Sequence, residues 1–358
     1  MASLARVVDT EERVERIGRR TQEVLTTEEL RALVATNDRP RAYIGFEPSG
    51  MLTVAHFITT RKIRDLQEAG CDVTVFLADW HAWINDKLGG DLERIRASGR
   101  YMQAGFTALG VDPDRARFRW ASELTDRADY WARVVRVAKS TTLARTKRAM
   151  SIMGRNEEEA TLDTSKLFYP AMQVADIFEL PVDIAYGGMD QRRAHVLARE
   201  VAHQRGWPTP VGIHTPLLSS LKGGGRMDPS SGAFEGKMSK SDPATAITLP
   251  APSEEIAARI AGAFCPAKQV AGNPVVELVE YVILPWLGSI EIPRAAKYGG
   301  PLTFQDSAGF RAEWESGKLH PQDLKSGVVV GLDQLIEPVR RYFTDHPEVS
   351  PTSFLGLP

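Results

Sequence analysis

Between Ala42 and Trp83 the chain alternates between strand-like and helix-like segments, and this alternation constrains the fold more than any other feature. The segment AYIGF (42–46) is short and apolar, HFITTRKIRDLQEAG (56–70) has helical spacing and ends at a glycine, and CDVTVFLADWHAW (71–83) is a nearly continuous apolar run. Such a run is typical of a buried parallel strand. Strand, helix and strand in this order predict a βαβ unit with a right-handed crossover.

The same alternation continues toward residue 216. We expect charged helices within 11–36 and further helices at about 92–109 and 126–153, with a strand at 117–122 between the last two. Helix, strand, helix and strand then follow at 166–180, 181–188, 189–204 and 211–216. This order predicts an α/β fold with a doubly wound, Rossmann-like parallel sheet. Such sheets bind ligands beyond the carboxyl ends of their strands, where Gly45, Glu47, His81 and residues 187–191 lie.

The length of 358 residues exceeds one typical core, so we expect two domains. The first, residues 1–250, contains the sheet and ends with a loop at about 222–245 that is rich in Gly, Ser, Pro and Lys. The second, residues 251–358, is predicted to be smaller and helical, with an amphipathic helix from about Pro321 to Phe343.

Composition excludes several classes of protein. Lysine and arginine total 44 against 46 acidic residues, so the net charge neither favours nor excludes a nucleic-acid partner. Cys71 and Cys265 lack the spacing of a zinc site, and we expect both to be buried small apolar residues in a reducing compartment. The charged amino terminus does not resemble a signal peptide, and no apolar run is long enough to span a membrane. We therefore expect a cytoplasmic protein.

The segment KMSKS, residues 237–241, lies inside the predicted loop. It carries two ammonium groups and two hydroxyls beside a glycine, and such a segment can close over a triphosphate and neutralise charge on a departing pyrophosphate. A lysine- and serine-rich loop without this context is more often a solvated basic surface. Its position after a Rossmann-like sheet favours the phosphate interpretation.

A second motif, YPAMQVAD, places three polar residues on one face of an apolar helix. Tyr169, Gln173 and Asp176 have the spacing i, i+4 and i+7, whereas Met172 and Ile177 point elsewhere. Polar groups on such a stripe need partners. The spacing alone is explained equally well by a buried structural network and by a ligand site.

These two motifs, together with GFEPSG…H and GGMDQR, closely resemble the class I tyrosyl-tRNA synthetases of archaeal and eukaryotic type. The likeness extends with few gaps from about residue 25 to 342, and the four motifs occur in the family's order. The resemblance implies a catalytic domain that joins tyrosine to ATP as an adenylate, with Mg²⁺ on the ATP phosphates and no metal bound by the protein itself. It also implies transfer of the tyrosyl group to tRNA(Tyr), a carboxyl-terminal domain that reads the anticodon, and a homodimer.

The first family signature, His-x-Gly-His, is here TVAH (53–56). His56 matches the second histidine and is expected to stabilise the ATP phosphates, while Ala55 in place of glycine adds one methyl group beside adenine. Thr53 replaces the first histidine and can donate one hydrogen bond, but it carries no charge. The lost charge-assisted contact is worth about 1.5–3 kcal/mol at most. A helix N-cap is an equally good explanation of Thr53 and is compatible with the phosphate role.

The resemblance also implies the remaining nucleotide contacts. The segment YGGMDQR (186–192) ends a strand with two glycines and starts a helix, so the backbone can approach a ligand closely, although Gly-Gly alone indicates only a turn. Asp190 is expected near the ATP ribose. The full set of ATP contacts is Gly45, Ala55, His56, Gly188, Asp190, Lys237, Met238, Ser239 and Lys240.

For the amino acid, the resemblance implies that Tyr169 and Gln173 hold the ammonium group, with Gln191 beside it. Asp176 would accept the phenol proton, with Tyr43 as its companion. A site built around a substrate hydroxyl rejects phenylalanine strongly, and the tyrosyl enzyme is itself the reference example of this effect. Two further residues, Glu47 and His81, are expected to line the pocket, although a single histidine beside a strand more often has a structural role.

The RNA contacts rest on weaker signals. Arg148 and Arg192 match positions that meet the end of the acceptor stem, although a plain solvated basic face explains them nearly as well. In LHPQDLK (319–325), His320 and Asp323 match the anticodon-reading segment, where a carboxylate can accept from a guanine edge. Tyr298 can stack on a base. HPQD is equally typical of a helix start with proline just inside it.

Two alternative functions remain open at this stage. One is a diverged paralogue that passes the tyrosyl group to a small-molecule amine, and the retained residues Tyr298, His320 and Asp323 argue against it. The other is a catalytically silent RNA-binding adaptor, which the substitution at Thr53 suggests. The retained residues Lys237, Lys240, Asp190 and Gln191 argue against the adaptor.

Overall fold

The computed structural model describes residues 10–153, 163–224, 226–227, 234–236, 238 and 245–355. The chain divides into two compact units, each assembled from separate stretches of sequence. The sheet unit comprises Met1–Pro48, Lys62–Ile95 and Val111–Pro216, and the helical unit comprises Ser49–Arg61, Arg96–Gly110 and Leu217–Pro358. The sequence did not predict this interleaving, and the domain boundary expected near residue 250 stays a prediction.

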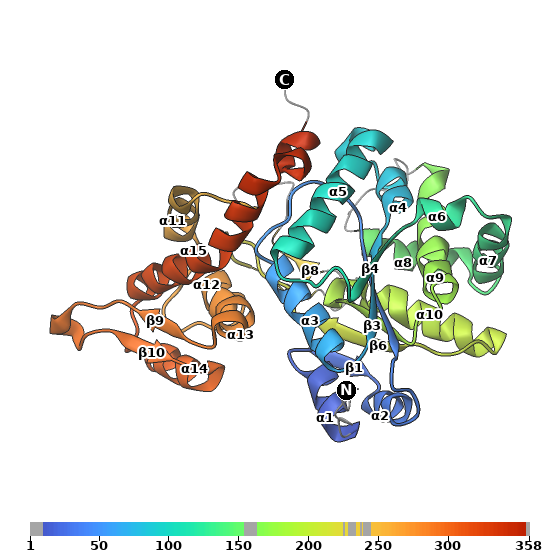
Figure 1. Cartoon of the computed structure of the whole chain (residues 1–358). Helices are drawn as coiled ribbons and strands as arrows, with labels where there is room; N and C mark the ends of the chain where they lie inside the picture. The colour runs from blue at the N-terminus through green and yellow to red at the C-terminus, as the bar shows by residue number, and fades with distance from the viewer. Residues whose placement is uncertain are drawn as a thin grey trace, which may run out of the picture. The chain divides into compact units, whose positions relative to one another are not determined.

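The described part of the sheet unit contains a six-stranded sheet in the order β1-β6-β5-β2-β3-β4. Figure 1 labels β1, β3, β4 and β6 of this sheet. Its strands are β1 (Glu23–Leu25), β2 (Arg41–Phe46), β3 (Asp72–Leu77), β4 (Ala116–Trp120), β5 (Ile184–Gly188) and β6 (Val211–Thr215). Neighbouring strands pair in parallel except β1, which is antiparallel to β6. The expected doubly wound parallel sheet is therefore confirmed, with an antiparallel edge strand added.

Three of the expected elements have different bounds. Residues 11–36 form α1 (Thr10–Gly18) and α2 (Thr27–Thr36), with the unpredicted strand β1 between them. Three residues are too few to show strand alternation, and β1 forms because β6 offers it an edge. The apolar run 71–83 ends as a strand at Leu77 and continues as α4 (Asp79–Ile84), because a short apolar run does not distinguish strand from helix.

The helix expected at 126–153 is broken near residue 141. It forms α7 (Ala128–Ala138), α8 (Leu143–Ala149) and the 3₁₀ turn η2 (Met150–Met153). The Thr142 hydroxyl accepts a hydrogen bond from the Arg145 N–H at 3.2 Å and so caps α8. Successive Ser and Thr residues compete for backbone hydrogen bonds in this way, which interrupts the helix.

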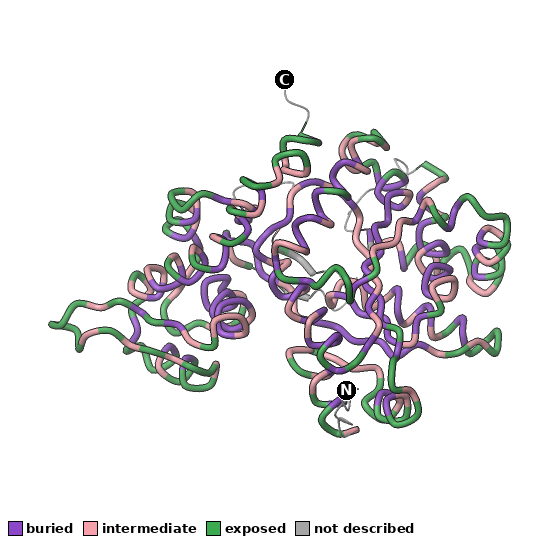
Figure 2. The backbone as a smooth tube through the Cα atoms, in the orientation of Figure 1, coloured by how far each residue is buried: buried purple, intermediate pink, exposed green. Residues whose placement is uncertain are grey.

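The other helices and turns of the sheet unit follow the expected order. They are α3 (His56–Glu68, whose first residues belong to the helical unit), η1 (Lys87–Gly90), α6 (Ser122–Thr125), η4 (Thr164–Leu167), α9 (Tyr169–Glu179), η5 (Met189–Gln191) and α10 (Arg192–Arg205). Strands β5 and β6 are almost entirely buried (Figure 2). The core packs side chains of β2 and β3 against α7, α9 and α10, including Tyr43, Phe76, Tyr130 and Met172. Cys71 is buried, but Cys265 is only half-buried, so that expectation was wrong for Cys265.

The helical unit is mainly helical, as expected after residue 253. Its elements are α5 (Leu92–Ala108, begun in the sheet unit), α11 (Ser253–Gly262), α12 (Pro274–Leu278), the π turn η7 (Val279–Ile283), α13 (Leu284–Leu287), η8 (Ala296–Tyr298), α14 (Ser307–Ser316), α15 (Pro321–Asp345), η9 (Pro347–Val349) and η10 (Pro351–Ser353). Two antiparallel ribbons were not predicted, β7 (Arg226–Met227) with β8 (Phe234–Glu235) and β9 (Ile290–Ile292) with β10 (Leu302–Phe304). Helix α15 confirms the predicted amphipathic helix.

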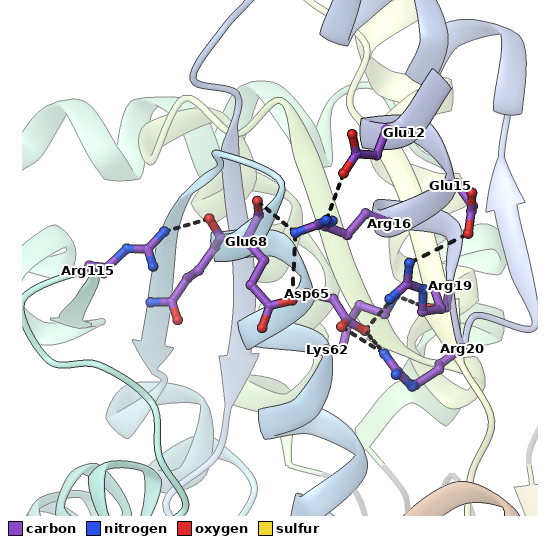
Figure 3. Close-up of polar contacts among 10 residues, drawn as sticks. Glu12, Glu15, Arg16, Arg19, Arg20, Lys62, Asp65, Glu68 and Arg115 are labelled. Atoms are coloured by element: carbon purple, nitrogen blue, oxygen red, sulfur yellow. Dashed lines mark hydrogen bonds and ion pairs between the residues drawn. The ribbon is translucent and has the colours of Figure 1, made fainter. Parts of the chain in front are cut away.

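A buried ion network joins α1 to α3 (Figure 3). Lys62 is 1% exposed, and its Nζ donates to the Ile17 carbonyl at 2.9 Å and to the Arg19 carbonyl. Asp65 is fully buried and accepts two hydrogen bonds of 2.7 Å from Arg20. Burial lowers the pKa of Lys62 from 10.5 to about 8, against the opposing effect of Asp65. Charged groups therefore fill a contact between these helices that apolar side chains usually fill.

Candidate active site

The signature turn TVAH belongs to the helical unit, where it pairs with the segment that follows the KMSKS loop. Thr53 forms an antiparallel bridge with Thr248, and the Val54 N–H donates to the Ile247 carbonyl at 3.0 Å. Helix α3 begins at His56, whose backbone N–H donates to the Thr53 carbonyl at 2.9 Å. The turn therefore fixes both signature residues against the backbone beside residue 248.

Thr53 and the ring of His56 face each other. The Thr53 N–H donates to His56 Nδ1 at 3.0 Å, and the Thr53 hydroxyl lies 3.4 Å from the same nitrogen. The ring also packs on Phe106 at 6.2 Å between centroids. The same nitrogen also lies 3.1 Å from the Thr53 carbonyl, so its role depends on the tautomer. In the tautomer that accepts from the Thr53 N–H, the proton of a neutral imidazole is on Nε2, and His56 can then donate through Nε2.

In the sheet unit, Asp176 lies at the centre of a buried polar network. Its side chain is 1% exposed, Oδ1 accepts from the Tyr130 hydroxyl at 2.9 Å, and Oδ2 lies 3.1 Å from His81 Nε2, without the alignment of a hydrogen bond. His81 packs edge-on against Tyr169. Burial lowers the pKa of His81, but Asp176, Glu47 and Asp79 outweigh it, so the pKa is raised. This network holds a carboxylate in place deep in the fold.

Tyr43 and Gly45 lie on the same face of β2 as this network. A Cβ atom at Gly45 would lie 2.7 Å from the Tyr43 hydroxyl, so the hydroxyl occupies space that only glycine leaves open. Tyr43 is 3% exposed, and burial together with the charge of Asp176 raises the pKa of its phenol well above the usual value. Tyr43 is therefore a neutral hydrogen-bonding group close to the carboxylate.

A second network surrounds Glu47 at the carboxyl end of β2. Its carboxylate accepts from the Tyr169 hydroxyl at 2.8 Å and from Asn85 Nδ2 at 2.9 and 3.2 Å. Lys87 Nζ lies 3.4 Å from it. Gln173 Nε2 donates to Gln191 Oε1 at 3.0 Å, and within the described residues the buried Gln173 Oε1 has no hydrogen-bond partner. A buried acceptor of this kind, one helical turn from Tyr169 on α9, suits an ammonium group.

The turn that carries Gln191 packs closely on the end of β5. A Cβ atom at Gly187 would lie 2.8 Å from Gln191 Cβ, so a larger residue would displace this turn. Gly188 ends the strand, and Asp190 lies in η5 directly before α10. The expected close approach of a nucleotide to this backbone stays a prediction.

The predicted phosphate and RNA residues have more varied positions. Lys237, Ser239 and Lys240 lie outside the described residues, and the Met238 N–H donates to the Leu218 carbonyl at 2.9 Å. Arg148 is exposed on α8, and Arg192 is bound by Glu23. Tyr298 is 63% exposed. His320 caps α15, with Pro321 and Asp323 in the first turn, which confirms the predicted helix start.

Comparison with known proteins identifies the family of the chain. The family model of class I tRNA synthetases (W and Y) matches residues 35–336. The tyrosine–tRNA ligase of Aeropyrum pernix is 48% identical over 339 residues, which cover 93% of each chain. The chain belongs to the class I tyrosyl-tRNA synthetases.

Solved structures of this synthetase family have the same fold. The tyrosyl-tRNA synthetase from Aeropyrum pernix gives a TM-score of 0.85 at 44% identity, covering 96% of this chain and 97% of its own. The tyrosyl-tRNA synthetase from Pyrococcus horikoshii, solved in complex with L-tyrosine, gives a TM-score of 0.89 at 41% identity. The match covers 97% of this chain and 99% of the Pyrococcus chain. The expected Rossmann-like class I fold is therefore confirmed.

Within this synthetase the structure brings together the predicted residues of the sheet unit: Tyr43, Gly45, Glu47, His81, Tyr169, Gln173, Asp176 and Gln191. Sequence reasoning missed Tyr130 and Asn85, which hold Asp176 and Glu47. Both side chains are buried, Tyr130 on the inner face of the amphipathic helix α7 and Asn85 at the end of α4, but both segments also contain charged residues, so the sequence offered no clear signal. A cavity of about 390 Å³ opens at the amino ends of β2 and β3, the opposite edge of the sheet, and contains none of the predicted site residues.

Proposed function

We propose that this chain joins tyrosine to ATP as tyrosyl-adenylate, releases pyrophosphate, and transfers the tyrosyl group to the 3′ end of tRNA(Tyr). The observation that carries the proposal is Asp176, a buried carboxylate held by Tyr130 and His81 beside Tyr43. The names of its relatives, tyrosine–tRNA ligases that match over nearly the whole chain, support the same reaction.

Asp176 recognises the phenol. Each carboxylate oxygen has two lone pairs, so an oxygen that already accepts from Tyr130 or faces His81 can accept one further donor. The substrate hydroxyl supplies that donor, and the Tyr43 hydroxyl is its companion. Phenylalanine leaves these buried groups without a partner, which costs far more than the lost contact alone.

Tyr169, Gln173 and Gln191 bind the ammonium group at the other end of the pocket. Gln173 Oε1 provides an acceptor that lacks a partner within the described residues, and the carboxylate of Glu47 supplies the opposite charge. A charge-assisted hydrogen bond in a partly buried site is about twice as strong as a neutral one. The amino acid is therefore held at both ends, with its carboxylate left to react.

That carboxylate attacks the α-phosphorus of MgATP without a general base, because it is already ionised. Catalysis then depends on positioning and on stabilising charge. His56, as an Nε2 donor, with Thr53, Lys237 and Lys240 would act on the phosphates. The nucleotide would lie along the backbone at Gly45, Ala55, Gly188, Asp190, Met238 and Ser239.

The remaining assignments concern partners and location. We place the acceptor end of tRNA at Arg148 and Arg192 and the anticodon at Tyr298, His320 and Asp323. We also propose a homodimer in the cytoplasm. Within the described residues, no helix is both long and apolar enough to cross a membrane.

Exchange of labelled pyrophosphate into ATP, followed by charging of total tRNA, tests the proposal. We expect tyrosine-dependent exchange and charging of one tRNA species. Exchange without charging would identify the diverged paralogue, and the absence of both would identify the silent adaptor. Phenylalanine in place of tyrosine serves as the control for the phenol site, and discrimination below about 100-fold would contradict the role of Asp176.

A further inference from the structure

Two buried histidines with no role in the proposed chemistry touch each other beneath the predicted amino-acid site. His195 on α10 is 2% exposed and His214 on β6 is fully buried. His195 Nδ1 lies 3.0 Å from His214 Nε2, and the rings are stacked with their centroids 5.0 Å apart. A polar pair in such a position needs an explanation other than packing.

Toward the surface, His214 lies against Glu23, which binds the partly exposed Arg192. His214 Nδ1 lies 3.1 Å from Glu23 Oε2, without the alignment of a hydrogen bond. Glu23 accepts three hydrogen bonds of 2.8 to 3.0 Å from Arg192, whose side chain is 42% exposed. The contacts therefore form a continuous chain from solvent to the core, through Arg192, Glu23, His214 and His195.

Toward the interior, His195 contacts the residues that position Gln191. The two residues are four apart, so they share a face at the start of α10. A Cβ atom at Gly187 would lie 2.8 Å from Gln191 Cβ and 3.2 Å from His195 Cε1, so the end of β5 packs directly on both. Because Gln191 also accepts from Gln173, a shift of the His195 ring would displace an ammonium-binding group.

Burial and unequal neighbouring charges act on the two rings. Burial lowers the pKa of His195 well below its usual value, with His214 acting in the same direction. Burial lowers the pKa of His214 to about 4, Arg192 adds to this effect, and Glu23 and Asp190 oppose it. An anion that draws Arg192 away from Glu23 would therefore leave His214 facing an unpaired carboxylate.

We propose that His195 and His214 are positioning residues for tyrosine activation, and that through Glu23 they couple a phosphate bound at Arg192 to the placement of Gln191. The proposal rests on the proposed function. Its ligand is the RNA phosphate that the proposed function assigns to Arg192, a partly exposed guanidinium whose present partner is a carboxylate.

The first test compares His195→Leu with His195→Asn in pyrophosphate exchange. Leucine removes the hydrogen bond to His214, whereas the asparagine amide can occupy the place of Nδ1. We expect His195→Leu to raise KM for tyrosine about 10-fold, with kcat and KM for ATP within about 3-fold, and His195→Asn to restore KM to within about 3-fold. An unchanged KM for tyrosine, or equal rises for tyrosine and ATP, would overturn the proposal.

The second test is a double-mutant cycle between Arg192→Gln and His214→Gln, read as KM for tyrosine during charging of tRNA. The glutamine side chain can occupy the place of His214 Nε2, but unlike histidine it cannot become protonated. We expect the double variant to differ from the product of the single effects by about 3-fold or more. The matched control is Arg193→Gln, the next residue on α10, which donates to the Arg148 carbonyl and should combine multiplicatively.

The outcomes distinguish a failure of the proposed function from a failure of the coupling. Wild-type protein without tyrosine-dependent exchange would remove the proposed function and this inference together. Wild-type exchange with a multiplicative Arg192 cycle would remove the coupling alone. If His195→Leu does not fold, Glu23→Gln interrupts the same chain from its partly exposed member, and an unchanged KM for tyrosine in charging would then overturn the coupling.

Discussion

Asp65 and Asp176 are both buried carboxylates on helices of the sheet unit, with side chains 0% and 1% exposed, yet their partners differ. Asp65 is bound by the cations Arg20 and Lys62, which balance its charge within the fold. Asp176 is held by a neutral phenol and a histidine, and one turn earlier on the same helix Gln173 Oε1 is an acceptor without a partner among the described residues. Burial alone therefore does not distinguish the two carboxylates, whereas the charges of their partners do.

The largest effect is expected for Asp176→Asn. This change removes the charge that the phenol site is built around, so kcat/KM for tyrosine should fall about 10³-fold and discrimination against phenylalanine should fall below about 100-fold. The tyrosyl enzyme is the reference case for such discrimination, at about 10⁵-fold. Pyrophosphate exchange with each amino acid is the measurement. A variant that keeps wild-type discrimination would place the substrate hydroxyl elsewhere.

Asp65→Asn should lower the stability of the protein and leave its activity nearly unchanged. Loss of this charge leaves Arg20 and Lys62 without their counter-ion, and breaking such a buried pair costs about 3 kcal/mol or more. We expect the free energy of unfolding in urea to fall by that amount, while kcat/KM for tyrosine stays within about 3-fold of wild type. A large loss of activity in the folded variant would end the contrast between the two carboxylates.

Lys62 makes the structural network sensitive to pH. Its pKa is about 8 when folded and 10.5 ordinarily, so the unfolded chain binds more protons between these values and stability rises with pH across this window. Relative to the Lys62→Met variant, the free energy of unfolding of the wild type should rise by up to about 3 kcal/mol between pH 7.5 and 10.5. Urea denaturation of both proteins at each pH measures the difference between their free energies of unfolding. The contributions of titrating groups that both proteins share cancel in this difference. A constant difference would show that Lys62 is not perturbed.

The smallest effect is expected for Tyr130→Phe. This change removes one hydrogen bond to Asp176 but leaves His81 in place, so KM for tyrosine should rise about 5- to 10-fold, with KM for ATP unchanged. Phenylalanine fills the same volume and preserves the packing of α7 on α9. If both KM values rose together, Tyr130 would be supporting the fold rather than the phenol site.

Much of this architecture could be predicted from local sequence. Helix α9 places Tyr169, Gln173 and Asp176 on one face because of their spacing, and the strands β2, β3, β5 and β6 follow from short apolar segments, whereas β4 contains two arginines and is indicated by its place between helices. Strand β1 could not be predicted, since three residues have no periodicity and pair only because β6 lies beside them. The break between α7 and α8 was present in the sequence as Ser140 to Thr142 but was not recognised.

The sequence by itself determined the alternation of strands and helices from β2 to β6 and the chemical groups that the motifs carry, because both depend on residues close together in the chain. Only the tertiary structure decided which side chains contact each of these chemical groups. Tyr130 and Asp176 are 46 residues apart, Asn85 and Glu47 are 38 apart, and His195 and His214 are 19 apart. Such pairs form when separate elements pack on one sheet, and periodicity along a single element contains no information about them.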